Sequence, residues 1–139
     1  MDEALQRVPL FSALGGKQLK RVAEAMSERT FAAGEEITTQ GEVGVGFYVV
    51  QEGRASVTMN ELPVGELGPG DHFGEISLIA ETPRAATVTA ETDMRCQGMT
   101  SWDFRKLVEG NGEIAWAILA STARKLYENA ERERAARAG

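Results

Sequence analysis

The sequence is poor in the side chains that most often carry metal and nucleophile chemistry, because its 139 residues include one cysteine, Cys96, and one histidine, His72. A single cysteine excludes an intrachain disulfide framework and fits a reducing compartment, so we expect a cytoplasmic protein. A single histidine excludes a His-rich metal site and leaves little room for a nucleophile triad. We expect Cys96 to be a small core residue and His72 to lie in a solvent-facing loop.

Several well-known sequence signals are also missing. Neither the P-loop pattern G-x-x-x-x-G-K-[ST] nor the hydrolase pattern G-x-S-x-G occurs. The apolar runs are far too short for a membrane span, and no signal peptide is visible at Met1. The net charge of −6 argues against nonspecific binding to nucleic acid or to an anionic membrane. The 42% of hydrophobic residues predict one globular domain over residues 1–139.

The middle of the chain has the pattern of a β structure. Short apolar or alternating segments, separated by glycines, are residues 36–39, 47–50, 54–59, 64–67, 86–90 and 94–99. We expect residues 60–63 to form a turn. About eight short strands with frequent turns predict a sandwich or barrel. Larger side chains are expected in the core, namely Met26, Met59, Met94, Met99, Trp102 and Trp116.

Both ends of the chain have helical patterns. Residues 17–26 repeat apolar side chains at helical spacing. A second helix is expected from Ser101 to about Val108, with Thr100 or Ser101 as its cap. Residues 113–136 read as one long helix of roughly 35 Å, apolar in its first half and charged on all sides in its last third.

One stretch, residues 73–88, has the chemistry of an anion site. Gly74 allows a close approach of the backbone, and N–H groups at a helix start after it would point at a common anion. Arg84 offers a five-donor fork suited to a phosphate. Glu75 would be repelled by that anion, so it should bind a hydroxyl pair instead. An anion beside a vicinal hydroxyl pair describes a nucleotide or sugar phosphate; the alternative is a generic helix–turn–strand with a surface Arg84–Glu75 pair.

The same stretch resembles the phosphate-binding cassette of cyclic-nucleotide-binding domains, whose pattern is F-G-E-x-x-L, a short spacer, then P-R-x-A. The resemblance extends from about Leu5 to Tyr127. It implies an α+β, mainly β fold, in which an eight-stranded jelly-roll-type β-roll is flanked by short N-terminal helices and a long C-terminal helix. The expected parts are helices in 1–27, the β-roll in 28–100 with the cassette at 73–88, and C-terminal helices in 101–137.

The family resemblance also implies how the phosphate and ribose are bound. Arg84 would pair with the exocyclic oxygens of the cyclic phosphate, and Glu75 would bind the ribose 2′-hydroxyl. Backbone N–H groups of Ile76, Ser77 and Ala85 would complete the phosphate cradle. Gly74 would allow close approach of the ribose.

The expected contacts to the base leave more alternatives. By their spacing from the cassette, Val57 and Leu67 would form an apolar wall for the base, unless they only pack in the core. The last helix covers the base in this family. Tyr127 is expected to stack on a purine, to pack on the roll, or to contact a partner subunit. The other candidates on this helix are Lys125, Leu126 and Asn129.

These residues predict a receptor for cAMP, with cGMP as the alternative ligand, because nothing supplies a general base, a nucleophile or a metal for catalysis. We therefore expect no enzyme activity and no cofactor. The ligand would signal by moving the C-terminal helix, and an unknown downstream protein would receive this signal. The same helix is the expected homodimer surface. The rival readings are a constitutive dimerisation or scaffold module with a vestigial site, and a regulatory fragment of a larger enzyme or transcription factor. Met1 and the lead-in favour a natural start.

Overall fold

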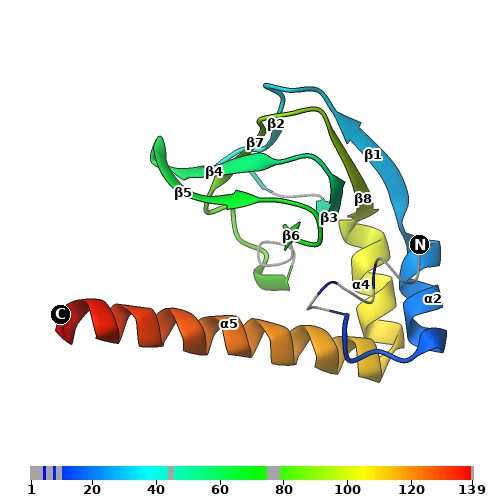
Figure 1. Cartoon of the computed structure of the whole chain (residues 1–139). Helices are drawn as coiled ribbons and strands as arrows, with labels where there is room; N and C mark the ends of the chain where they lie inside the picture. Colours follow the sequence, from blue (N-terminus) through cyan, green and yellow to red (C-terminus); the bar gives the residue numbers. More distant parts are fainter. Residues whose placement is uncertain (1–4, 6–7, 9–10, 44–45, 75–78, 139) are drawn as a thin grey trace.

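The computed structural model describes residues 5, 8, 11–43, 46–74 and 79–138, and within them eight strands form two antiparallel four-stranded sheets (Figure 1). The first sheet has the order β1-β8-β3-β6 and the second the order β2-β7-β4-β5. Together with the helices this confirms the predicted fold class. The strands are β1 (Ser27–Phe31), β2 (Glu36–Thr38), β3 (Gly46–Glu52), β4 (Ala55–Met59), β5 (Leu62–Leu67), β6 (His72–Phe73), β7 (Thr87–Ala90) and β8 (Met94–Thr100).

Within the described residues, three helices of ten or more residues flank the roll, namely α2 (Gly16–Ala25), α4 (Ser101–Gly110) and α5 (Gly112–Ala138). Thr100 caps α4, because its hydroxyl accepts a hydrogen bond from the Asp103 backbone N–H at 3.2 Å. The 27 residues of α5 give a length of about 40 Å at 1.5 Å per residue. In Figure 1, α2 and α4 lie side by side at one end of the roll, whereas α5 runs beneath it.

Strand β3 divides the apolar interior into two clusters. Phe47 and Val49 face the helices, where they pack with residues such as Phe104 and Ile114. Val50 faces the second sheet and packs with Cys96 and other residues of the roll. Successive side chains of a strand point to opposite faces, so a strand buried on both sides is apolar throughout. This accounts for the continuous apolar run that marks β3 in the sequence.

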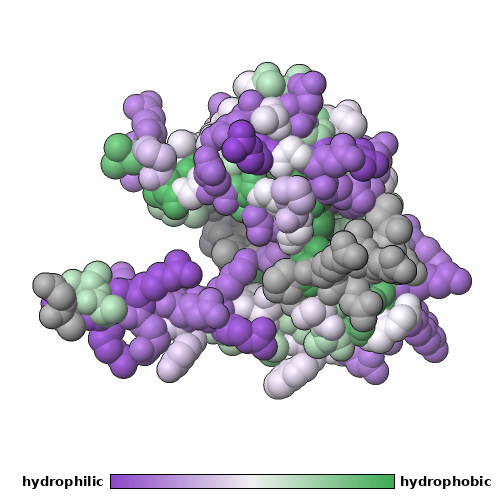
Figure 2. All heavy atoms as spheres, viewed as in Figure 1, coloured by the Kyte–Doolittle hydropathy of each residue, from purple (hydrophilic) through white to green (hydrophobic). Residues whose placement is uncertain are grey.

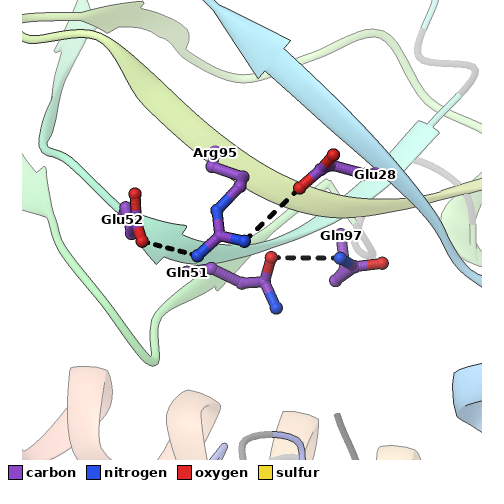
Figure 3. Close-up of polar contacts among 5 residues, drawn as sticks. All are labelled: Glu28, Gln51, Glu52, Arg95 and Gln97. Atoms are coloured by element: carbon purple, nitrogen blue, oxygen red, sulfur yellow. Dashed lines mark hydrogen bonds and ion pairs between the residues drawn. The ribbon is translucent and has the colours of Figure 1, made fainter.

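The first sheet carries a polar network on its outer face (Figure 3). Arg95 of β8 bonds Glu52 of β3 at 2.5 Å and Glu28 of β1 at 3.5 Å, and the hydrogen bond and charge of Glu52 raise the pKa of Arg95. Because these groups are largely exposed, each pair adds little to stability. Arg95 nevertheless joins three neighbouring strands, which favours their observed register.

The β4–β5 hairpin differs from its predicted form. The turn is confined to Asn60 and Glu61, whose φ angles are 51° and 67°, and β5 begins at Leu62 rather than at Val64. Two residues with positive φ form the tight turn whose twist matches that of antiparallel strands. Pro63 is accommodated because β5 is the edge strand of its sheet.

Other sequence-based expectations were wrong about exposure. His72 is half-buried in β6, and not in a solvent-facing loop. The expectation of core positions fails for Trp102, Trp116 and Met59, whose exposed fractions are 79%, 69% and 40%. Apolar character predicts burial only where another element covers the side chain, and spacing along one helix does not show which of its faces is covered.

No helix in the described parts of the chain is both long enough and apolar enough to cross a membrane.

Cys96 generates a prediction about alkaline stability. Burial raises the pKa of its thiol from the ordinary 9.0 to about 11. The unfolded chain therefore releases this proton at lower pH than the folded chain, so the stabilisation is present below pH 9 and is lost as the pH rises to about 11. Over this window the free energy of unfolding should fall by about 2–3 kcal/mol more in the parent than in Cys96→Ala.

Urea unfolding of both proteins at pH 8, 9, 10 and 11 measures this difference, since the other titrating groups are common to both. Equal pH slopes for the two proteins would contradict it.

Candidate functional site

A cavity of about 280 Å³ opens between the second sheet, residues 82–86 and helix α5. Its size is close to the lower end of the range for small-molecule sites. The residues that line it are Thr38, Val57, Leu67, His72, Phe73, Gly74, Thr82, Pro83, Arg84, Ala85, Ala86, Val88 and Lys125. Six of the nine predicted site residues lie in the described part of the chain, and five of these six line this cavity.

Arg84 is a buried cation in the wall of the cavity, with only 8% of its surface exposed. Its Nη1 donates to the Gly74 carbonyl at 2.9 Å and its Nη2 to the Gly46 carbonyl at 2.7 Å. A buried charge requires such hydrogen bonds, because it has lost its hydration. The guanidinium stays protonated at every physiological pH, so the site keeps a fixed positive charge suited to an anion.

Gly74 must be glycine for this arrangement. Its φ of +105° is a conformation that side chains rarely adopt. A Cβ atom there would lie 2.5 Å from the Gly46 carbonyl oxygen and 2.9 Å from Arg84 Nη1. The absence of a side chain at residue 74 thus lets the cassette backbone reach Arg84.

Part of the cavity lining is apolar. Val57 of β4 and Leu67 of β5 line the cavity, are each half-buried and also pack against the apolar cluster of the roll. Ala85 lies on the wall next to Arg84 and presents only a methyl group. The cavity therefore combines one cationic end with an apolar face, as a ligand with an anionic part and a flat apolar part requires.

Helix α5 reaches the cavity through Lys125. The Nζ atom of Lys125 lies 3.4 Å from Nε2 of His72, and both residues line the cavity. Tyr127 is 67% exposed and is not among the lining residues. Leu126 and Asn129 do not line the cavity either. The structure therefore places Lys125 at the site and leaves the predicted stacking residue Tyr127 outside it.

Three predicted site residues, Glu75, Ile76 and Ser77, lie outside the described residues, so their roles stay predictions. His72 was not predicted as a site residue. The available signal was its position next to Phe73 and three residues before Glu75, the predicted ribose ligand. The described residues contain no group of three or more His, Cys, Asp or Glu side chains arranged to hold a metal ion.

Residues 28–111 match the family model of the cyclic nucleotide-binding domain. The chain belongs to this family. The match covers more than half of the chain. It includes the β4–β5 hairpin and the whole cassette, residues 73–88. The predicted resemblance is therefore confirmed.

Known relatives combine this domain with different functions. The chain is 40% identical over 111 residues to a cyclic nucleotide-gated potassium channel of Rhizobium etli. The match covers 80% of this chain but 31% of the channel. The N-terminal domain of a Streptomyces coelicolor transcriptional regulator is 33% identical with a TM-score of 0.79, over 95% of both chains. The regulatory domain of Toxoplasma gondii PKA, solved with cAMP, is 31% identical with a TM-score of 0.78, over 91% of this chain and 49% of that one. The chain thus spans less than a third of the channel's length.

The Arg84 hydrogen bonds generate a prediction for the ligand-free protein. Lysine cannot reproduce the fork that reaches two carbonyls, so Arg84→Lys should lower the free energy of unfolding by about 1.5–3 kcal/mol. Urea unfolding measures the loss. Arg132→Lys, on the exposed surface of α5, is the matched control and should have no effect. An Arg84→Lys protein as stable as this control would show that the two carbonyl contacts contribute nothing.

Proposed function

We propose that this chain is a receptor domain for cAMP and has no catalytic activity of its own. The observation that carries the proposal is the buried Arg84 guanidinium in a cavity that is also lined by the apolar side chains of Val57 and Leu67. Membership of the cyclic nucleotide-binding family supports the ligand class. The similarity to a PKA regulatory domain solved with cAMP supports the choice of nucleotide.

In the proposed complex the cyclic phosphate lies at Arg84 and the base lies against Val57 and Leu67. Gly74 allows the ribose to approach the backbone. The ribose 2′-hydroxyl is bound by Glu75. Backbone N–H groups of residues 76, 77 and 85 complete the phosphate contacts. These contacts are the strongest in the site, because hydrogen bonds to a charged group are stronger than neutral ones.

Calorimetry with cAMP tests the proposal. The parent should bind, and Arg84→Lys should bind about ten- to hundredfold more weakly, the factor that the loss of one charge-assisted hydrogen bond accounts for. No heat and no thermal shift at millimolar cAMP would refute the receptor function. Binding by Arg84→Lys with parental affinity would refute the role of Arg84.

The side of the cavity at Ala85 favours cAMP over cGMP. The methyl group of Ala85 cannot accept a hydrogen bond from the guanine N2 amino group, and burying that group without a partner costs roughly 1–3 kcal/mol. Adenine carries no group at C2 and has no such penalty. Lys125 acts in the opposite direction, since its ammonium could donate to guanine O6. In the structure, Lys125 Nζ lies 3.4 Å from His72 Nε2.

We predict that the parent prefers cAMP by about tenfold, and that Ala85→Thr gains cGMP affinity by supplying a hydroxyl acceptor. Competition binding with the two nucleotides measures both. Lys125→Met separates the opposing effect and should widen the preference for cAMP, whereas Lys106→Met on α4 should leave it unchanged. Equal or tighter cGMP binding by the parent would refute the preference, and no gain in Ala85→Thr would refute its mechanism.

We propose that α5 transmits the signal and also pairs with a second copy of the chain. Its residues 116, 119, 123, 126 and 130 alternate at spacings of three and four, which is the pattern of a coiled-coil seam. Trp116, Leu119 and Leu126 are 69%, 59% and 72% exposed. Figures 1 and 2 show that the C-terminal end of α5 extends beyond the roll. Exposed apolar side chains along the helix are the surface that a partner would cover.

Truncation of α5 tests both roles. Removing all residues after Ala123 deletes Lys125 and two of the five seam residues, so cAMP affinity should fall about two- to tenfold, and a dimer should dissociate more readily. Truncation after Ala130 keeps Lys125 and Leu126 and is the matched control. Calorimetry and analytical ultracentrifugation measure the two effects.

Leu126→Glu separates the two roles of the helix. It should weaken the dimer while leaving cAMP affinity unchanged, because Leu126 does not line the cavity. If truncation after Ala123 leaves both properties unchanged, α5 is neither the lid nor the dimer surface.

The exposed seam on α5 also favours a second function, constitutive dimerisation with a vestigial site. Calorimetry with cAMP decides between a receptor and a constitutive dimerisation module, since a scaffold dimerises without binding cAMP. The greater length of the relatives supports a third arrangement, in which this domain regulates a larger protein.

A further inference from the structure

A short segment between β2 and β3 is bonded to the backbone of Arg84. The Gly41 N–H donates to the Arg84 carbonyl at 2.8 Å, and the Arg84 N–H donates to the Glu42 carbonyl at 2.8 Å. Val43 forms an antiparallel bridge with Pro83. We call residues 40–43 the strap. By pairing with residues 83 and 84, the strap fixes the backbone from which the Arg84 guanidinium extends.

The first residue of the strap, Gln40, is bonded to two other elements. Its backbone N–H donates to the Thr87 hydroxyl at 2.9 Å, at the start of β7. Its side chain makes a pair of hydrogen bonds with Asn60, in which Gln40 Nε2 donates to Asn60 Oδ1 at 3.0 Å and the Asn60 N–H donates to Gln40 Oε1 at 2.8 Å. Asn60 is the first residue of the β4–β5 turn.

The hairpin that Gln40 holds is weakly supported elsewhere. Strand β5 is an edge strand, and residues 62–66 are all exposed. Few apolar contacts therefore hold the tip in place, and a segment of this kind opens at little cost in free energy. The strands of the same hairpin carry Val57 and Leu67, which form the apolar wall of the cavity.

We propose that Gln40 is a positioning residue that fixes the apolar wall of the cavity relative to Arg84. One end of Gln40 belongs to the strap that holds the Arg84 backbone, and the other end holds the turn of the hairpin that carries the wall. A ligand bound between Arg84 and this wall needs both at a set separation. This role in binding rests on the proposed function, because the ligand is taken to be cAMP.

Loss of the Gln40–Asn60 pair should leave the hairpin free to move and make the ligand order it on binding, which weakens affinity. We expect Gln40→Ala to bind cAMP about tenfold more weakly, the factor that one or two ordinary hydrogen bonds account for. Asn60→Gly should lose part of this affinity, since glycine keeps the positive φ of the turn and the backbone N–H that donates to Gln40 Oε1, while removing the side-chain acceptor. Because both changes act on one pair, the double variant should lose no more than Gln40→Ala alone.

The experiment compares parent, Gln40→Ala, Asn60→Gly, the double variant and Gln51→Ala. Gln51 is the matched control, because its side chain also accepts a hydrogen bond, from Gln97, but on the far face of the first sheet (Figure 3). Calorimetry gives the cAMP affinities. A purely structural role for Gln40 would lower thermal stability without the shared, non-additive loss of affinity.

A second measurement needs no ligand. Amide hydrogen exchange of Arg84, whose N–H is bonded to the strap, should accelerate about threefold or more in Asn60→Gly, although residue 60 does not contact Arg84 in the described hydrogen bonds. It should stay unchanged in Gln51→Ala. Unchanged exchange in Asn60→Gly would overturn the coupling. So would additive losses of affinity, or parental cAMP affinity in both single variants. If the parent binds no cAMP, the proposed function fails while the exchange result still decides whether Gln40 couples the two elements.

Discussion

The burial of one cation, the Arg84 guanidinium, constrains the whole site. A charge that has lost its hydration needs oriented acceptors, and the carbonyls of Gly74 and Gly46 supply them. Those two carbonyls belong to segments far apart in the sequence, so Arg84 joins the cassette to the start of β3. Residue 74 lacks a side chain because the space for a Cβ atom is taken by these same groups.

The architecture places the site between a rigid core and a helix that projects from it. Ile114 and Ile118 anchor the start of α5 in the apolar cluster shared with α2, α4 and β3. About two turns further along, Lys125 reaches the cavity and contacts His72. From Ala123 to Arg137 no residue of α5 is buried, so packing holds the start of the helix more firmly than its end.

Much of the fold and part of the site could be predicted because the signals are local. Alternating and continuous apolar segments marked six of the eight described strands, and the spacing of Gly74 and Arg84 marked two residues that line the cavity. Short strands β1 and β6 had no such signal, since β1 is mostly exposed and β6 has two residues. Tyr127 was chosen for its aromatic ring, but the helical phase of α5 presents Lys125 to the cavity instead.

By itself, the sequence determined the fold class, the position of the cassette and the residue types that an anion requires, because strand period, glycine freedom and the guanidinium fork are properties of residues and their near neighbours. Tertiary structure alone decided which helix residue meets the cavity, that His72 lines it, and that Gln40 joins the hairpin turn to the backbone next to Arg84. These contacts link residues 20 to 53 positions apart. They depend on how two sheets and a helix pack in space, and no periodicity along the chain records that packing.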